Sequence, residues 1–505
     1  MKTIHLLGAA LTLLLLVPSC SKDELYQNPA TSFTDETVLE NLETVNTVLM
    51  GAYSWTGHFW YHTISQISLD VMGGDLTISD GSYGFSTYNW LMFAYNYIQY
   101  PRVVDGWWSA YAPYMWQRAY QAIDQCNELI ANADQLPAGS EDVLAQAYGL
   151  RGWNFLNLYH LYCPAYTDKG DSGQGLFLRL TPGSADRNDV PRSDLGTSMK
   201  QILGDFTYAY DHCTAESREF IGKKAATLFL ARTYLEMGDY ANARKYAEEL
   251  SSFDGKDLMT PEEYQAGFHT PNAEWIWGFN FTEETCNIYA SIPSFYHSGT
   301  FKDKKPESRF GGSEYGARTT YEYLAENAVD WMTGYSTVRA TFNFTALFGP
   351  NDCRALFPFY ISEKDGMMIS KYSSVETLGN ADYPMARMAE AYLIEAEALL
   401  QTGDAARSLA VLNTLQNKRK GSLSPSSTID EIWKERRREL YGEGFALTDI
   451  KRLGKPLERT GQDHWSSTKS LPANSPRMMY PIPQDELDHN SNTTAADQNE
   501  YWRQP

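Results

Sequence analysis

The chain has 505 residues and a net charge of −21 at pH 7, and 43% of its residues are hydrophobic. This acidic excess argues against nucleic acid as a partner, because phosphates need a basic face, and against a polybasic membrane patch. It fits a soluble body and a neutral ligand. The length and hydrophobic content predict one large domain, or roughly two to three intertwined ones, with a substantial core.

Residues 1–19 have the pattern of a signal peptide. Lys2 precedes the uncharged apolar run Leu6–Val17, which is too short for a bilayer, since a span needs about 20 residues. The run ends in Leu-Val-Pro-Ser-Cys at residues 16–20, which resembles a lipobox, although Pro18 departs from the commonest pattern. We therefore expect cleavage before Cys20 and a lipid on that residue. A plain secretory peptide with an incidental cysteine is the alternative.

Residues 20–34 are rich in Ser, Asn, Thr and Pro, and they predict a flexible, lipidated tether. The sequence Ser-Lys-Asp-Glu at 21–24 resembles the acidic export tag of lipoproteins that face the cell exterior. We expect a lipid-anchored protein of the outer membrane that faces outward. The lipid is its expected membrane attachment, because no later segment is apolar for long enough to cross a bilayer.

Helices are predicted over residues 35–53, 108–132 and 141–162. In the first, Thr34-Asp35 offers an N-cap, and apolar residues recur at helical spacing from Val38 to Leu49. In the third, an apolar face runs from Leu150 to Leu161. These segments predict a helical scaffold.

A repeated pattern occurs around two Gly-Asp pairs, Gly238-Asp239 and Gly403-Asp404. Each pair follows a helix of small and apolar residues and precedes a second helix. Glycine permits the left-handed turn that ends the first helix, and aspartate caps the next one. The pattern resembles the tetratricopeptide helix-turn-helix unit, with any antiparallel helix pair as the alternative. The copies lie too far apart in the chain to predict a continuous array.

Residues 54–107, 163–193 and 254–382 show little helical periodicity and are rich in Gly, Pro, Asn, Thr and aromatic residues. They are too long for simple connectors, and long loops on a helical scaffold are usually functional. The 34 Tyr of the chain exceed what a core needs. Because tyrosine combines an apolar face with a polar tip, it suits sugar rings or a wet interface.

Known catalytic and metal patterns are weak. Five cysteines remain besides Cys20, so at least one thiol is unpaired, and the absence of a CxxC pair argues against a zinc ribbon. Gly-Asp-Ser-Gly at 170–173 matches a protease nucleophile segment, but the surrounding pattern is helical rather than β. His58 and His62 have a metal-binding spacing without an evident third ligand. We expect no metal and no cofactor.

Three blocks near the C-terminus carry a family resemblance. Residues 387–398 read RMAEAYLIEAEA, and residues 435–440 read ERRREL, followed by Glu443-Gly444, Asp449 and the sequence KRLG at 451–454. The third block is Tyr-Pro-Ile-Pro at 480–483, with a closing Gln-Asn-Glu-Tyr at 498–501. Together they resemble the SusD/RagB family. The resemblance is strong over 380–505, moderate over 20–253 and faint over 254–380.

The blocks themselves indicate structure rather than catalysis. The Arg and Glu residues of 435–443 can pair at i,i+3 and i,i+4 along one helix and lock the C-terminal lobe. The segment Tyr480–Pro483 is held extended by its prolines and is expected to pack the chain end against the helices.

The resemblance implies a mainly α fold, in which a scaffold of tetratricopeptide-like helix pairs carries a long irregular lobe. It divides the chain into an N-terminal helical region with binding loops over 35–253, an aromatic-rich lobe over 254–382 and a C-terminal region over 383–505. It implies a cell-surface protein that binds an oligosaccharide without catalysis. It also implies that the protein is the lid of a SusC-like TonB-dependent transporter, to which it delivers nutrient.

Two loop regions have the composition of a glycan site, which needs aromatic platforms and polar groups for hydroxyls. One spans Asp75–Trp108 and the other Asn287–Tyr323. The predicted ligand-binding residues are Tyr83, Tyr88, Asn89, Trp90, Tyr289, Tyr296, Arg309, Tyr315 and Arg318. Each aromatic residue alone is more often part of a core than of a site.

Other classes of protein stay open at this point. A lipid-anchored glycosidase would need two carboxylates at a set separation, which 63 acidic residues do not exclude. A surface scaffold or adhesin without a small ligand is the other alternative. The sequence does not choose among starch, fructan, host glycan and peptide as the ligand.

Overall fold

The computed structural model describes residues 39, 41–78, 89–99, 101, 112–183, 189–268, 271–282, 285–286, 291–296, 337–357, 360–362, 366–372 and 381–503. These residues are mainly helical, with a few short antiparallel strands, which confirms the predicted fold class. The predicted signal peptide, the tether and Cys20 lie outside them. Within the described ranges, no helix is both long and apolar enough to cross a bilayer.

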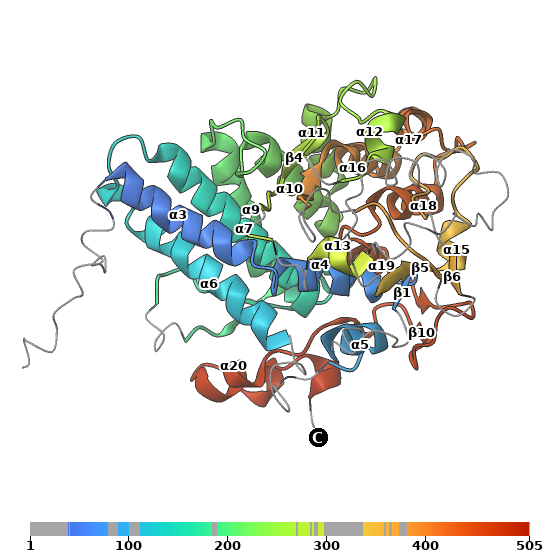
Figure 1. The fold of residues 1–505 in the computed structure, drawn as a ribbon. Helices are drawn as coiled ribbons and strands as arrows, with labels where there is room; N and C mark the ends of the chain where they lie inside the picture. The colour runs from blue at the N-terminus through green and yellow to red at the C-terminus, as the bar shows by residue number, and fades with distance from the viewer. Residues whose placement is uncertain are drawn as a thin grey trace, which may run out of the picture.

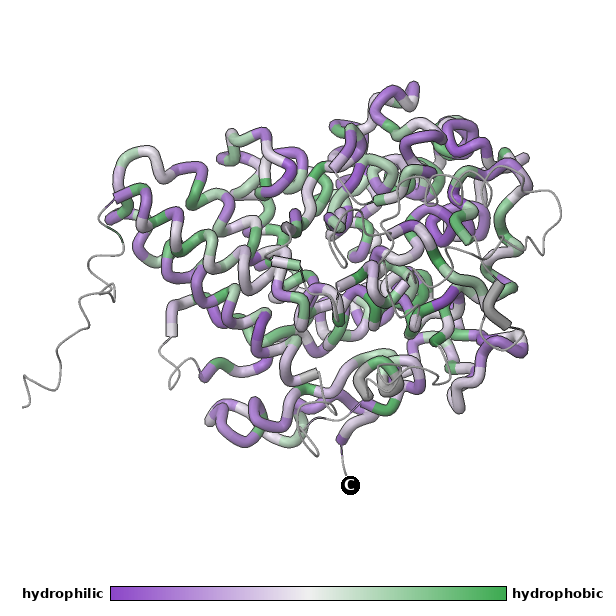
Figure 2. Tube along the Cα trace, in the orientation of Figure 1, coloured by the Kyte–Doolittle hydropathy of each residue, from purple (hydrophilic) through white to green (hydrophobic). Residues whose placement is uncertain are grey.

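The long helices form an array in which each packs on the next along the chain (Figure 1). Hydrophilic and hydrophobic residues alternate along them, as expected for helices with one buried face (Figure 2). The array consists of α3 (Leu42–Thr56), α6 (Ala112–Ala131), α7 (Glu141–Tyr162), α9 (Leu195–His212), α10 (Lys223–Met237), α11 (Tyr240–Leu250), α16 (Met388–Gln401) and α17 (Ala405–Lys418). A further helix, α18 (Ile429–Leu440), packs on α16.

The two Gly-Asp motifs end and begin helices as predicted. Gly238 and Gly403 adopt φ of 73° and 92°, the left-handed conformation that favours glycine. The carboxylates of Asp239 and Asp404 then accept the amide hydrogens of Asn242 and Arg407, at 3.1 and 3.2 Å.

The two helix pairs are neighbours in space, because α11 packs directly on α16. The guanidinium of Arg232 on α10 also donates to the carboxylate of Glu390 on α16, with Nε 2.7 Å from Oε1. The expectation of a discontinuous array was therefore wrong, since the intervening lobe interrupts the chain but not the stack.

The helix predicted over 35–53 corresponds to α3 over the residues that the structure describes, and α3 extends from Leu42 to Thr56. Its N-cap is Asn41, whose side chain accepts the amide hydrogen of Thr44 at 3.1 Å. The predicted range of 141–162 agrees with α7, and the range of 108–132 agrees with α6 over the residues that the structure describes.

Residues 54–107 are less irregular than predicted, because they contain α4 (His62–Val71) and α5 (Asn89–Asn96). Every residue of α4 is buried, including the polar ones, although its apolar residues Ile64, Ile67 and Val71 recur at helical spacing. The remaining short helices are α8 (Tyr166–Lys169), α12 (Pro261–Gln265), α13 (Ile292–Tyr296), α15 (Phe342–Thr345), α19 (Ala446–Arg452) and α20 (Gln484–His489), with 3-10 turns η2 (Ala133–Gln135), η3 (Gly170–Ser172), η5 (Pro476–Met478), η6 (Ala495–Asp497) and η7 (Glu500–Trp502).

A two-stranded antiparallel stem joins the lobe to the scaffold. It pairs β4 (Trp275–Phe279) with β8 (Tyr383–Arg387), so the chain leaves and re-enters the lobe at one place. A second sheet has the order β1 (Leu76–Ile78), β5 (Val338–Ala340), β7 (Gly366–Met367) and β6 (Tyr360–Ser362). Two further pairs are β2 (Gln174–Phe177) with β3 (Arg192–Asp194), and β9 (Leu457–Glu458) with β10 (Ser470–Leu471).

The C-terminal segment lies against α7, as predicted. The amide of Tyr480 donates to the carbonyl of Leu161 at 2.8 Å. The side-chain amide of Asn499 donates to the carbonyls of Tyr162 and Tyr480, at 2.8 and 2.6 Å. One hydrophobic cluster extends from Leu39 to Ile482, so the three predicted regions share a core.

The Arg and Glu residues of α18 pair mainly with other elements, which corrects the expectation of pairing along the helix. In the described part of the chain, only Arg438 of the three α18 arginines pairs within the helix, with Glu435, and Lys434 pairs there with Glu431. Glu439 accepts from Arg387 of β8 at 2.7 Å and from Arg419, after α17, at 3.0 Å. All three side chains are at most 1% exposed. The cluster locks the C-terminal region by joining the stem to α17 and α18.

Candidate functional site

A cavity of about 520 Å³ lies where the stem meets the corner between α3 and α4. Its volume falls within the range of small-molecule sites, about 300–1,000 Å³. Its walls come from segments that are distant in sequence: Met50, Tyr53, Ser54, Gly57, His58, Phe59, His62, Thr63, Glu219, Phe220, Gly278, Phe279, Asn280, Phe281, Thr285, Cys286, Ser291, Ile292, Pro293, Ala381 and Tyr383.

Local structure fixes this corner. Helix α3 ends at Thr56, and the amide of Gly57 closes the last turn by donating to the carbonyl of Tyr53 at 2.8 Å. The chain then reverses and enters α4 at His62. On the opposite wall, Phe279 at the end of β4 pairs with Tyr383 at the start of β8.

Aromatic rings dominate the inner wall. The His62 ring lies 5.1 Å from the Phe279 ring and is stacked on the Phe281 ring at 5.4 Å with an interplanar angle of 22°. The Tyr383 ring is 5.8 Å from His62. A flat sugar ring can stack on such faces through its C–H groups, while its hydroxyls stay at the rim.

The two histidines of the cavity are neutral at physiological pH. Burial lowers the pKa of His62 to about 3, and its Nδ1 lies 3.1 Å from the carbonyl oxygen of Gly57. Burial, together with the Arg118 guanidinium, also lowers the pKa of His58. Within the described residues, no three His, Cys, Asp or Glu side chains are grouped as metal ligands.

Polar groups line the outer part of the cavity. The side-chain amide of Asn280 donates to Glu219 Oε1 at 3.3 Å, and both residues are exposed. Beneath them, the buried Asp382 accepts the amide hydrogen of Phe281 at 2.9 Å. Burial raises the pKa of Asp382 to about 6. This combination of aromatic faces and hydrogen-bonding groups suits an uncharged polar ring.

Most of the predicted ligand residues lie outside the described part of the chain: Tyr83, Tyr88, Tyr289, Arg309, Tyr315 and Arg318. Asn89 and Trp90 are the first two residues of α5, and the description of this helix does not extend to their side chains. The second predicted loop region does border the cavity, through Ser291, Ile292 and Pro293.

Tyr296 is buried, with 0% of its surface exposed, so the expectation that it offers a face to ligand is corrected here. Its hydroxyl donates to Asp70 at 3.5 Å, and its ring lies 5.9 Å from that of Tyr372. Burial raises the pKa of Asp70 to about 7 against the hydrogen bonds from the amides of Gly444 and Ala446. Tyr296 therefore anchors α13 to α4.

The cavity aromatics were not among the predicted site residues. The sequence signal for them is the run from Trp55 to His62, in which six of the eight residues are histidine or large aromatic residues. Phe279 and Phe281 carry no such signal, because only the folded stem brings them to this corner.

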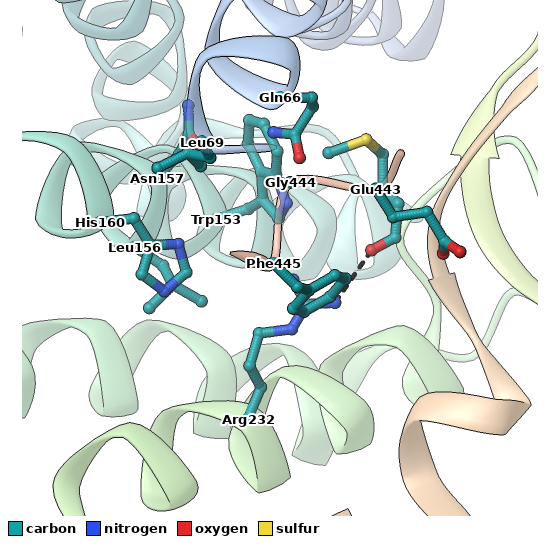
Figure 3. A pocket seen from close by; sticks show the side chains of 11 residues that line it. Gln66, Leu69, Trp153, Leu156, Asn157, His160, Arg232, Glu443, Gly444 and Phe445 are labelled. Atoms are coloured by element: carbon teal, nitrogen blue, oxygen red, sulfur yellow. Dashed lines mark hydrogen bonds between the residues drawn. The ribbon is translucent and has the colours of Figure 1, made fainter. Parts of the chain in front are cut away.

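Two other cavities differ from this one in size or in the charge of their lining. One of about 20 Å³ lies among α4, α7 and α10, bordered by Asn157, His160 and Arg232, and has room for a water molecule but not for a sugar ring (Figure 3). The other, of about 360 Å³, lies beside α18. There Arg437 and Lys455 approach the Trp433 ring and are paired with Asp75 and Asp430.

Two family models together match most of the chain. Residues 243–502 match the model described as the SusD family, and residues 66–235 match a model described as "Starch-binding associating with outer membrane". The first match covers more than half of the chain. The protein therefore belongs to the SusD family, as its C-terminal blocks predicted.

Relatives and solved structures agree with this assignment. The chain is 22% identical to SusD-like protein P38 of Formosa agariphila over 390 residues, which are 68% of this chain and 73% of that protein. It is 24% identical to SusD-like protein P2 of the same organism over 421 residues, 75% of this chain and 78% of that protein.

Among solved structures, a putative sugar binding protein from Bacteroides vulgatus superposes with a TM-score of 0.75 at 21% identity, over 92% of this chain and 99% of that one. Surface glycan-binding protein A from Bacteroides uniformis gives a TM-score of 0.68 at 18% identity, over 91% and 99%. At these identities the likeness shows the fold.

Proposed function

We propose that this protein is a non-catalytic, lipid-anchored receptor that captures an oligosaccharide outside the cell. The observation that carries the proposal is the cavity of about 520 Å³, in which neutral histidine and phenylalanine rings face exposed polar groups. Membership of the SusD family supports it, since one matching model is described as starch-binding and associated with the outer membrane. The names of the similar sugar- and glycan-binding proteins point the same way.

The absence of catalysis is part of the proposal. Cleaving a glycosidic bond requires two carboxyl groups flanking one bond, at about 5–5.5 Å or 6.5–9.5 Å. Glu219 is the carboxylate that borders the cavity in the described residues, and Asp382 is turned to the backbone amide of Phe281. The two histidines of the cavity are held neutral by burial.

The partner and the remaining contacts are proposed from the family resemblance. The protein would act as the lid of a SusC-like TonB-dependent transporter and would pass its ligand to it. The loop residues Tyr83, Tyr88, Asn89, Trp90, Tyr289, Arg309, Tyr315 and Arg318 remain predicted ligand contacts, which would add to the cavity.

Chemical modification of Cys286 tests the site. Cys286 borders the cavity and is partly exposed, whereas Cys126, Cys163, Cys213 and Cys353 are buried. In the full chain carrying Cys20→Ser, a maleimide is expected to react first at Cys286 and to abolish glycan binding. The measurement is retention on affinity gels that contain starch, xylan, cellulose derivatives, fructan or pectin, before and after modification.

Two results would argue against the proposal. One is a modified protein that binds the retained polysaccharide as well as the unmodified protein does. The other is that none of these glycans retards the wild-type protein, whereas a peptide mixture protects its Cys286 from maleimide. The variant Cys286→Ser is the control, because it should keep binding after the same treatment.

Lipid attachment has its own prediction. Replacing Cys20 by Ser is expected to remove the acyl chains, because the thiol that carries them is gone, and with them the stable outer-membrane attachment. Incorporation of labelled palmitate and digestion by protease added to intact cells are the measurements. Cys286→Ser should incorporate label normally. Equal labelling of the Cys20→Ser chain would refute the anchor.

A further inference from the structure

Four ring-bearing side chains form a ledge at the corner between α3 and α4, which we call the aromatic ledge: Trp55, His58, Phe59 and Trp60. Successive ring centroids are 6.2, 4.8 and 4.6 Å apart. The middle pair, His58 and Phe59, is stacked with an interplanar angle of 19° and also borders the cavity. The ledge therefore continues the cavity wall along the surface.

None of the four rings is fully buried, although each belongs to a large side chain. Half-buried aromatic residues gathered in one place keep apolar surface in contact with water, and contiguous patches of this kind mark interaction sites. Phe59 and Trp60 also pack against the hydrophobic core, so each of these two rings combines a buried part with an exposed part.

A cation from the neighbouring helix α6 orients the outer end of the ledge. The Arg118 guanidinium lies over the Trp55 ring, 4.6 Å from its centroid. Its Nη1 donates to Gln121 at 2.8 Å, and its buried Nε has no partner among the described residues. Arg118 forms no ion pair with a described carboxylate, so donors remain for a hydroxyl at the edge of the ring.

We propose that the aromatic ledge is a second glycan subsite, which binds further sugar units of the same chain whose first units occupy the cavity. This inference rests on the proposed function and makes its ligand an extended oligosaccharide rather than a mono- or disaccharide. Stacking on Trp55 supplies contact for the C–H face of a sugar, and Arg118 supplies hydrogen bonds to hydroxyls at its rim.

The continuity of the two sites selects this occupant. His58 and Phe59 contribute to both surfaces, so a chain that leaves the cavity past them meets Trp55 or Trp60 next. The partly exposed ring faces can stack on sugar units of different kinds, whereas a protein partner would need a larger patch. Both Trp residues lie outside the cavity lining and act only on a ligand long enough to reach them.

The test is the dependence of affinity on chain length. Calorimetry on the full chain carrying Cys20→Ser would use malto-, cello-, xylo- and galacturono-oligosaccharides, each from disaccharide to heptasaccharide. In the series that binds, wild-type affinity is expected to rise with length. Trp55→Ala should keep the disaccharide affinity and bind the heptasaccharide about three- to tenfold more weakly. Trp55→Phe should fall between the two.

Tyr208→Ala is the matched control, since Tyr208 also stacks in a half-exposed aromatic pair, with Tyr148 at 4.0 Å on the α7–α9 face. It should follow the wild-type series. The ledge is not a subsite if the affinities of Trp55→Ala and wild type coincide at every chain length, or if Tyr208→Ala loses as much affinity for the heptasaccharide as Trp55→Ala does. Either result would leave the cavity as the proposed binding site. If no series and no polysaccharide binds wild-type protein, the proposed function itself fails.

Discussion

Replacing Glu439 by Gln is expected to lower the free energy of unfolding by about 3–5 kcal/mol. Glu439 accepts from three fully buried guanidinium groups, those of Arg387, Arg419 and Arg354, at 2.7, 3.0 and 3.0 Å. Removing its charge leaves these cations in a low-dielectric interior with fewer carboxylates, and water does not reach them to compensate. Because domains are stable by about 5–15 kcal/mol, the variant is expected to melt at a clearly lower temperature.

Denaturant unfolding monitored by circular dichroism provides the measurement. Glu248→Gln is the matched control, because Glu248 pairs with Arg244 and Arg407 at the partly exposed surface, where an ion pair contributes about 0–1 kcal/mol. Equal stabilities of the two variants would show that the buried cluster is not a major source of stability.

The same cluster makes the free energy of unfolding depend on pH. Burial alone would raise the pKa of Glu439, but the guanidinium groups of Arg419, Arg387 and Arg354 outweigh it and hold that pKa well below its usual value. A carboxyl with a depressed folded-state pKa stabilises above its unfolded pKa of about 4.5, and this contribution is lost as pH falls through the folded pKa. The stability difference between wild type and Glu439→Gln should therefore shrink below about pH 4.5.

Among single substitutions, Phe281→Ala is expected to weaken glycan binding most. Phe281 is half-buried, and its ring is stacked on that of the neutral His62. Alanine removes the aromatic face from the cavity and keeps the backbone amide that donates to Asp382 at 2.9 Å. We expect about tenfold weaker glycan binding at every chain length, which corresponds to ~1.4 kcal/mol.

Calorimetry with the retained glycan gives the affinity, and the melting temperature reports on folding. Phe253→Ala makes the same chemical change at an exposed position, where the ring is 42% exposed and lies outside the cavity. It should bind like wild type. If Phe281→Ala changes neither the melting temperature nor the glycan affinity, the cavity is not the glycan-binding site.

The scaffold could be predicted where the signal is local. The range of α7 follows from a long run of mainly apolar residues that is buried on nearly all sides, and the ends of α10 and α16 follow from a glycine that must adopt a left-handed conformation. Helix α4 was missed because the helical spacing of Ile64, Ile67 and Val71 extends over a helix of only 10 residues. The partners of the α18 arginines were missed for a related reason, since spacing along a helix carries no information about β8 or α17.

The cavity was the least predictable part of the molecule. Its aromatic wall combines residues near 60, near 280 and near 380, and composition indicates only that each segment holds large rings. The run at 55–62 is visible in the sequence, where its two histidines have a metal-binding spacing but no evident third ligand. The fold assigns them another role, because burial keeps both neutral and places them among phenylalanines.

The stem formed by β4 and β8 has a consequence for how such proteins can vary. Trp275 pairs with Arg387 and Phe279 with Tyr383, so the long excursion between them begins and ends at adjacent points. When the two ends of a chain segment are held together, the entropic cost of closing it grows only with the logarithm of its length. Each doubling of the length adds about 0.6 kcal/mol. Segments of different length and composition could therefore be exchanged above the stem, provided that Arg354 and Lys371, which pair with the buried Glu439 and Glu443, are kept. Ligand preference and scaffold stability would then evolve, or be engineered, almost independently.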